Sequence, residues 1–93
     1  MKPPKVVRVA VNAPLRKLFD YLPPPAGPPP VEGARIRVPF GRSGKIGLIV
    51  EAEADSSLPA ARLRRADQVL DAQPVIDGTL LRLLVWSADY YGH

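Results

Sequence analysis

The chain has 93 residues, with 13 Lys and Arg against 9 Asp and Glu for a net charge of +4, one histidine and no cysteine. This length accommodates one small domain, and the absence of cysteine excludes a disulfide framework, a thiolate zinc site and a cysteine nucleophile. A lone histidine at position 93 argues against His-rich metal sites and Ser-His-Asp catalysis. No apolar run approaches the roughly 18 residues that span a bilayer, so we expect a cytoplasmic protein.

The positive charge and the prolines are both unevenly placed. Residues 1–50 carry nine Lys or Arg and two acids, whereas residues 51–93 carry four Arg and seven acids. A basic half favours a polyanionic partner, although ordinary surface charge gives the same pattern. There are 12 prolines, more than twice the usual share of about 5%. Because proline is excluded from helix interiors and central strands, we expect only short elements in the first two-thirds.

The N-terminal third predicts two strands and a stiff loop. Val6 to Val11 alternates valines on one face with Arg8 on the other, which is typical of a half-buried strand. Residues 15–22 are compatible with a helical turn or a strand, and the flanking prolines favour a short strand at Phe19–Leu22. The segment 23–30 holds six prolines and predicts an extended loop, either a connector or a ligand for a proline-binding domain.

The middle of the chain predicts a hairpin. Residues 34–38 alternate apolar side chains with Arg35 and Arg37, which indicates a strand with one cationic face. Residues 39–44 form a glycine-containing turn, and residues 45–54 return as the second strand. In that strand we expect one face to hold Leu48, Val50, Ala52 and Ala54 and the other to hold Glu51 and Glu53.

The C-terminal part predicts a further strand at 63–70, of poor alternation, and a helix over 77–91 with Asp77 as its N-cap. We therefore predict a single domain over 1–93, mostly β, with a β-rich part at 5–71. Small antiparallel sheets remove exposed edges by curling, so the fold class is a small, OB-like β-barrel with a C-terminal α-helix.

Catalytic motifs are absent from the sequence, and we expect no enzymatic activity. Gly41-Arg42-Ser43-Gly44 is too short for a phosphate loop, and Glu51 and Glu53 have no nucleophile or metal partner.

The remaining candidate site combines aromatic side chains with cations. Its residues are Phe19-Asp20-Tyr21, then Arg35, Arg37, Phe40, Arg42 and Lys45. Cations that neutralise phosphate beside aromatic surfaces suit nucleic acid. Asp20 is unusual in such a run, and either caps a turn or accepts hydrogen bonds from a base.

Four segments occur in an order and spacing that resemble a known family. They are Leu18–Tyr21 (LFDY), Gly33–Gly41 (GARIRVPFG), Ile46–Val50 (IGLIV) and Ala88–Tyr91 (ADYY). Together, over roughly residues 6–91, they resemble the N-terminal DNA-binding domain of PriA, the primosomal replication-restart helicases. The resemblance implies a domain that captures the 3′-terminal nucleotide of the nascent leading strand at stalled replication forks. It implies binding without base preference, for primosome assembly and replication restart.

The resemblance also implies which residues bind DNA. The family's pocket falls on Phe19, Asp20, Tyr21, Gly41 and a basic position at Arg64, where the family usually has lysine. Arginine keeps the charge but changes the geometry, so the neighbouring Arg65 is a second candidate. From the cation pattern we add Arg42 and Lys45 as nucleic-acid-binding residues.

Further expectations follow from the resemblance. No cofactor is expected in this chain, because ATP, Mg and Zn belong to helicase regions that it lacks. The expected partners are DNA with a free 3′ end, forked DNA, the rest of the helicase, other primosome proteins and single-stranded DNA-binding protein, at bacterial replication forks and without a membrane.

Two other functions stay open: a protein-interaction domain that uses the Pro-rich loop or a sheet edge, and a generic OB-type binder of single-stranded DNA. Trp86 lies on the polar stripe of the predicted helix. We expect it either to be exposed as a docking face for the helicase body or to fold down over the barrel.

Overall fold

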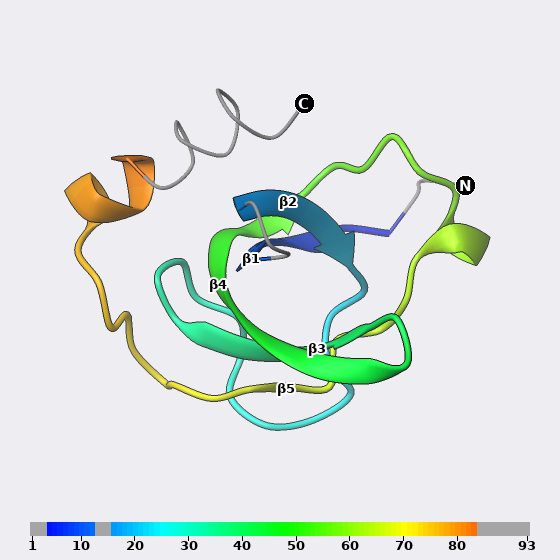
Figure 1. Cartoon of the computed structure of the whole chain (residues 1–93), viewed down its shortest axis with the longest axis horizontal. Helices are drawn as coiled ribbons and strands as arrows, with labels where there is room; N and C mark the ends of the chain where they lie inside the picture. The colour runs from blue at the N-terminus through cyan, green and yellow to red at the C-terminus, as the bar shows by residue number, and fades with distance from the viewer. Residues whose placement is uncertain (1–3, 13–15, 84–93) are drawn as a thin grey trace.

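A computed structural model describes residues 4–12 and 16–83, without the side chain of Arg16. The elements in chain order are β1 (Val6–Asn12), β2 (Arg16–Tyr21), β3 (Arg35–Phe40), β4 (Ser43–Ala54), the 3-10 turn η1 (Ala60–Arg62) and β5 (Gln68–Val69), followed by a helical segment over 78–83 (Figure 1). The strands form one antiparallel sheet in the order β2-β1-β4-β3-β5. The mostly β architecture and the helical segment after it confirm the coarse prediction.

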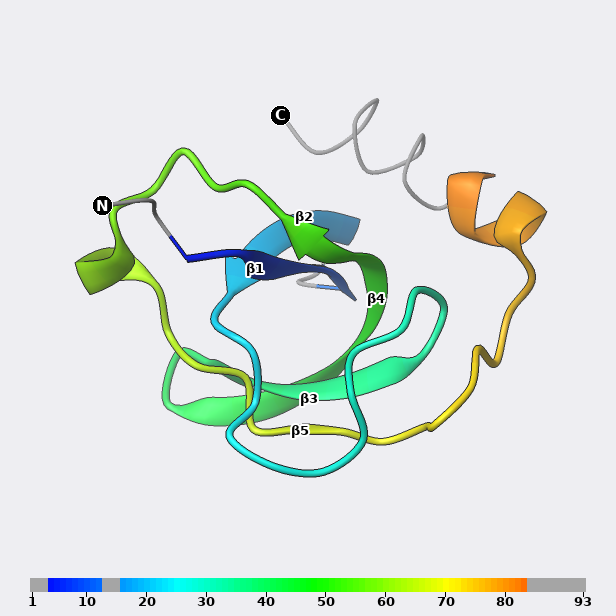
Figure 2. The same cartoon turned by 180° about the vertical axis from the view of Figure 1, so that it is seen from behind.

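The sheet is rolled like a small β-barrel but is not closed, so the predicted barrel is confirmed only in part. The 12-residue β4 curves through the molecule and pairs with β3 along its first half and with β1 along its second (Figures 1 and 2). The two edges touch at one bridge, where Leu22 N–H donates to the Arg64 carbonyl and Ala66 N–H to the Leu22 carbonyl, both at 2.9 Å. Because β5 has only two residues, it cannot pair along the length of β2.

The core is built on the valine alternation of β1. Val7, Val9 and Val11 are fully buried and pack with Ile36, Val38 and Ile49 of β3 and β4. The other face of β1 is covered as well, with Val6 at 0% and Ala10 at 7% exposure, so the strand is not half-buried as predicted. Leu81 of the helical segment packs against Ala10, which explains part of this extra burial.

The predicted face of β4 is interrupted by a bulge. Opposite β1, Arg8 pairs with Glu51 but Val9 pairs with Ile49, so Val50 has no opposing residue. A bulge rotates the strand locally. Ile49 enters the main core and Val50 the second cluster with Leu81. From Val50 to Ala54 the expected alternation holds, with Val50 and Ala54 buried, Ala52 partly buried, and Glu51 and Glu53 exposed.

The predicted hairpin is confirmed, with a tighter turn. Phe40 pairs with Ser43, so the loop contains only Gly41 and Arg42, and Pro39 belongs to β3 rather than to the turn. Gly41 has φ +60° and Arg42 does not have a positive φ, which matches the Gly-first type II′ turn that suits hairpins.

The segment after β4 departs most from prediction. The strand expected at 63–70 shrinks to β5, because η1 and the edge bridge occupy the residues before it. Asp77 caps the helical segment as predicted, its Oδ1 accepting from Leu80 N–H at 2.9 Å. However, Leu80 and Leu83 are 51% and 56% exposed, so the described part does not bury a broad apolar face.

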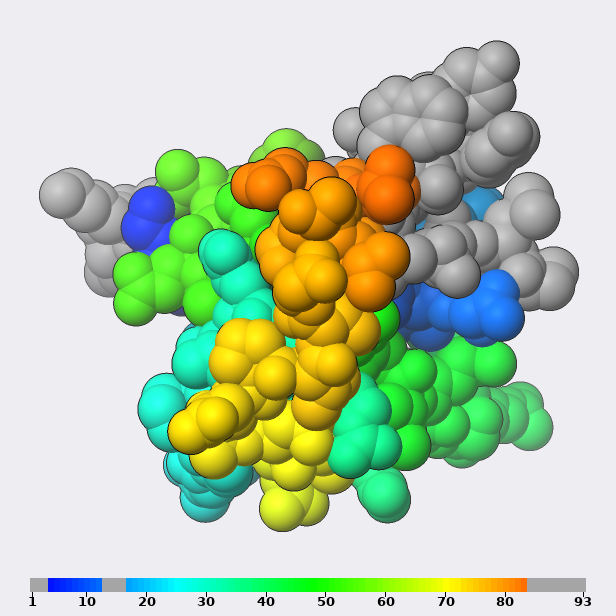
Figure 3. Space-filling view, turned by 90° about the vertical axis from the view of Figure 1, so that its left-hand side faces the viewer, coloured from blue at the N-terminus to red at the C-terminus, as the bar shows by residue number. Residues whose placement is uncertain are grey.

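Figure 3 shows residues 70–83 crossing one side of the molecule, in yellow to orange. No helix within the described residues is long and apolar enough to cross a membrane. The predictions for Trp86 and for Ala88–Tyr91 lie outside the described residues.

Candidate nucleic-acid interface

Asp20 lies in a row of charged residues across three strands. The register places Arg8 of β1 opposite Asp20 of β2 on one side and opposite Glu51 of β4 on the other. Cross-strand neighbours on one face are close enough for opposite charges to interact. The pairing of the strands therefore brings a carboxylate, a guanidinium and a second carboxylate together.

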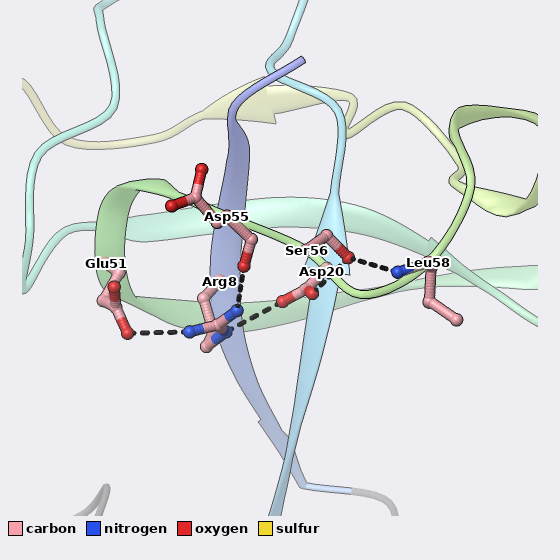
Figure 4. A network of polar contacts seen from close by, with 6 residues as sticks. All are labelled: Arg8, Asp20, Glu51, Asp55, Ser56 and Leu58. Carbon is pink, nitrogen blue, oxygen red and sulfur yellow. Dashed lines mark hydrogen bonds and ion pairs between the residues drawn. The ribbon is translucent and has the colours of Figure 1, made fainter. Parts of the chain in front are cut away.

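These side chains form a connected hydrogen-bond network (Figure 4). Arg8 Nε donates to Asp20 Oδ1 at 2.9 Å, Arg8 Nη1 to Glu51 Oε1 at 2.8 Å and Arg8 Nη2 to the Asp55 carbonyl at 2.8 Å. Ser56 Oγ donates to Asp20 Oδ2 at 2.7 Å, so each carboxylate oxygen of Asp20 has one donor. Asp20 is held in one orientation from two sides.

The network leaves some of the hydrogen-bond acceptor sites of the Asp20 carboxylate unused. A carboxylate offers about four lone-pair sites, of which the network uses two. The hydrogen bond to Asp20 raises the pKa of Arg8 above its ordinary value, while burial acts in the opposite direction. The Asp20 side chain is still 15% exposed, so this fixed anion remains open to a donor from outside.

The aromatic neighbours of Asp20 point to the opposite face of β2. Tyr21 is 5% exposed and its hydroxyl donates to the Pro39 carbonyl at 2.9 Å. Burial raises the pKa of the Tyr21 phenol above its ordinary 10.0. Phe19 makes an edge-to-face contact with Phe40, with ring centroids 5.3 Å apart. These rings belong to the core and fix the strand from which Asp20 projects.

A cavity of about 580 Å³ opens between β2 and the segment around η1. Its lining residues are Arg8, Leu18, Phe19, Asp20, Tyr21, Ser57, Leu58, Arg62 and Arg64. The volume lies within the range of small-ligand pockets, roughly 300–1,000 Å³. Three arginines and a single carboxylate give the cavity a positive balance that suits an anionic ligand.

The edge of β2 adds backbone groups to the cavity. Leu22 directs its N–H and C=O away from β1, toward Arg64 and Ala66. Alternate residues of a strand direct these groups to the same side, so Asp20 N–H and C=O also point away from β1. Within the described residues neither group bonds to the backbone opposite. Asp20 therefore presents a carboxylate, a backbone donor and a backbone acceptor at one place.

The sequence matches the model of the 3′ DNA-binding domain (3′BD) of PriA over residues 8–93. This chain belongs to that family. It is 34% identical over 87 residues to the replication restart protein PriA of Haemophilus influenzae, covering 94% of the chain. It is 26% identical over 86 residues to the same protein from Buchnera aphidicola subsp. Schizaphis graminum and from subsp. Acyrthosiphon pisum, covering 92%. The chain spans about 12% of the length of each of these relatives.

The family match confirms the recognition from sequence and the assignment of the chain as a 3′ DNA-binding domain. In this PriA domain, four of the predicted site residues line the cavity: Phe19, Asp20, Tyr21 and Arg64. Gly41 is joined to them through its carbonyl, which accepts from Arg64 Nη1 at 3.0 Å. Arg65 instead donates to the Pro23 carbonyl at 2.7 Å and is not among the lining residues. The geometry thus favours Arg64 as the basic residue of the site.

The other two predicted residues lie beyond the cavity. Lys45 Nζ sits 5.6 Å from the centre of the Phe40 ring and lines a different hollow, and Arg42 is exposed in the hairpin turn.

The sequence analysis did not identify five residues of the network and the cavity: Arg8, Ser56, Ser57, Leu58 and Arg62. The sequence did contain a signal for Arg8, because the alternation of its strand placed it on the face away from the valines. Within the described residues no group of three or more His, Cys, Asp or Glu side chains could hold a metal ion.

Proposed function

We propose that the cavity at the edge of β2 binds the 3′-terminal nucleotide of a DNA strand without base preference. The observation that carries this proposal is the fixed Asp20 carboxylate beside its own outward-facing backbone N–H and C=O. Every base offers at least one donor on its pairing edge and an acceptor beside it. A site with an acceptor, a donor and a second acceptor can satisfy any of the four bases.

Other residues that line the cavity are suited to the phosphate and to the face of the base. Arg62 and Arg64 line the cavity and are suited to a phosphate, because a planar guanidinium offers paired donors and a permanent charge. Leu58, 45% exposed, gives the cavity an apolar surface for the face of a base. A positively charged groove along the backbone is typical of single-stranded nucleic-acid sites.

The wider role follows from the family. In the whole protein, this domain holds the 3′ end of the nascent leading strand at a stalled bacterial fork, in the cytoplasm, for primosome assembly and restart. Its further partners are forked DNA, the rest of the helicase, other primosome proteins and single-stranded DNA-binding protein. The chain itself binds without cofactor and without catalysis, and ATP, Mg and Zn act in the remaining part of the protein.

The test compares single-stranded DNA with and without an end. Linear and circular DNA of the same sequence and length are titrated with the chain in a competition assay. We expect the linear form to compete at least tenfold better, and a 3′-phosphorylated linear form to lose most of that advantage. Equal competition by the circle would contradict end binding and favour the generic single-strand binder.

A further inference from the structure

The β3–β4 hairpin carries cations that no carboxylate of the described residues neutralises. Residues 37–46 contain Arg37, Arg42 and Lys45 and no Asp or Glu. Within the described residues none of these three forms an ion pair, and we call them the hairpin patch. By contrast, ion pairs to acids occupy Lys5, Arg8 and Arg35. The hairpin patch can take an external anion without first giving up an internal partner.

The hairpin patch is hollowed. Arg37, Gly44, Lys45 and Ile46 line a depression of about 450 Å³ that shares no lining residue with the nucleotide cavity. Gly44 has no side chain, so the surface between Arg37 and Lys45 is recessed. Asp67 is the acid bonded to this strand, through its backbone N–H to the Arg37 carbonyl at 2.9 Å, but its carboxylate is in no ion pair within the described residues.

Direct contacts connect the hairpin patch to the nucleotide cavity. Lys45 lies over the Phe40 ring, and Phe40 packs edge-to-face against Phe19, which lines the cavity. Arg64, another lining residue, donates to the Gly41 carbonyl in the hairpin turn. Figures 1 and 2 agree that the hairpin turn and η1 lie on the same side of the molecule. A strand whose end sits in the cavity therefore finds a cationic surface next to it.

We propose that the hairpin patch binds the phosphates of the nucleotides on the 5′ side of the terminal one. The ligand of this domain is then a short single-stranded tail with a free 3′ end, not an isolated terminal nucleotide. This inference rests on the proposed function, because the terminal nucleotide in the cavity sets the direction of the tail. When exposed cations without internal partners contact the phosphates of DNA, they displace the counterions bound there, and the release of those counterions favours binding.

The experiment uses DNA of two lengths to distinguish binding of the terminal nucleotide from binding of the nucleotides on its 5′ side. The chain is titrated with a dT dinucleotide that lacks a 5′ phosphate and with a dT dodecamer, both with a free 3′ hydroxyl, at several salt concentrations. The variants are Arg37→Gln, the double variant Arg37→Gln/Lys45→Gln, and Arg82→Gln as the matched control. Arg82 is exposed, has no ion pair within the described residues and lies in the helical segment on the other side of the molecule (Figure 1).

We expect the double variant to bind the dinucleotide within about twofold of the native chain and the dodecamer roughly tenfold more weakly at low salt. Since each single-strand phosphate contact contributes about 0.7 to the slope of log K against log salt, the dodecamer slope should become shallower by about 1.4. Arg82→Gln should change neither, and Arg37→Lys/Lys45→Arg should restore the dodecamer affinity.

Two results would overturn the inference. One is a dodecamer affinity and slope in the double variant that match those of Arg82→Gln. The other is an equal loss for both DNA lengths, which would assign the hairpin patch to the terminal nucleotide. Failure of the proposed function looks different, because the native chain would then bind the dodecamer equally well with its 3′ hydroxyl free or phosphorylated.

Discussion

Successive residues of β2 have opposite surroundings, although they are neighbours in the chain. Phe19 and Tyr21 face the interior, where Tyr21 is 5% exposed and Phe19 packs against Phe40. Asp20 faces outward, held by Arg8 and Ser56 at the border of the cavity. The difference follows from the period of two in a strand, and it places the two rings of one tripeptide against the core and its carboxylate on the outer face.

This division predicts that stability and DNA binding can be changed separately. Loss of a ring from the inner face leaves a cavity in the main core, which costs stability. Loss of the outward carboxylate removes no packing, because Arg8 keeps its hydrogen bonds to Glu51 and to the Asp55 carbonyl. Substitutions at adjacent positions should therefore affect different measurements.

The largest effect is expected for Tyr21→Ala. It removes a buried ring from the core together with the hydrogen bond to the Pro39 carbonyl. We expect a loss of about 3–5 kcal/mol in the free energy of unfolding, measured by urea denaturation, with DNA binding lost only as far as the chain unfolds. A stable Tyr21→Ala chain with selectively lost DNA affinity would break the division, since Tyr21 would then act directly on the nucleotide.

The second prediction concerns the outward side chain. Asp20→Ala should weaken binding of a free 3′ end by about 1–3 kcal/mol, the scale of lost hydrogen bonds to a charged group, while the chain stays folded. Binding is measured by competition with 3′-hydroxyl DNA, and folding by the urea midpoint. Unchanged affinity in the folded variant would leave Asp20 as a purely structural partner of Arg8 and Ser56.

The sequence predicted those parts of the fold that depend on local pattern. The valines of β1 and the Arg–Val alternation of 35–38 indicated strands, Gly41 marked the hairpin turn, and Asp77 marked a helix start. In each case the signal lies within a few residues, because alternation, turn conformation and capping are local properties.

The parts that were missed depend on partners far apart in the chain. Arg8 meets Glu51 through a bulge at Val50, and Asp20 meets Ser56 across 36 positions. No periodicity within β1 or β2 encodes that register. The small β5 is likewise defined by its position beside β3 and not by its own pattern. The family's motif therefore named Asp20, whereas only the folded chain identifies the side chains that orient it.

The third prediction tests whether orientation of Asp20 matters for binding. Arg8→Lys keeps a positive charge beside Asp20 but cannot also reach Glu51 and the Asp55 carbonyl, because a single ammonium lacks the fork of a guanidinium. We expect affinity for a free 3′ end to fall by about 1 kcal/mol. Ser56→Ala, which removes the other donor to Asp20, should act in the same direction. Native affinity in both folded variants would show that Asp20 needs no positioning residue.

The smallest effect is expected at the Tyr21 hydroxyl, and it depends on pH. Tyr21→Phe removes the hydrogen bond to the Pro39 carbonyl and should lower the free energy of unfolding by about 1 kcal/mol at neutral pH. Burial raises the pKa of the folded phenol above its ordinary 10.0, so its stabilisation is fully present below pH 10 and is lost as the pH rises through the folded value.

The measurement for this last prediction is urea unfolding of the native chain and Tyr21→Phe from pH 8 to pH 11. The stability difference between them should stay constant up to about pH 10 and then shrink, because only the native chain has this phenol to ionise. The 3′-end affinity of Tyr21→Phe at neutral pH should equal that of the native chain. If that affinity fell while the stability difference did not depend on pH, the hydroxyl would be serving the nucleotide, and the inner face of β2 could no longer be regarded as structural alone.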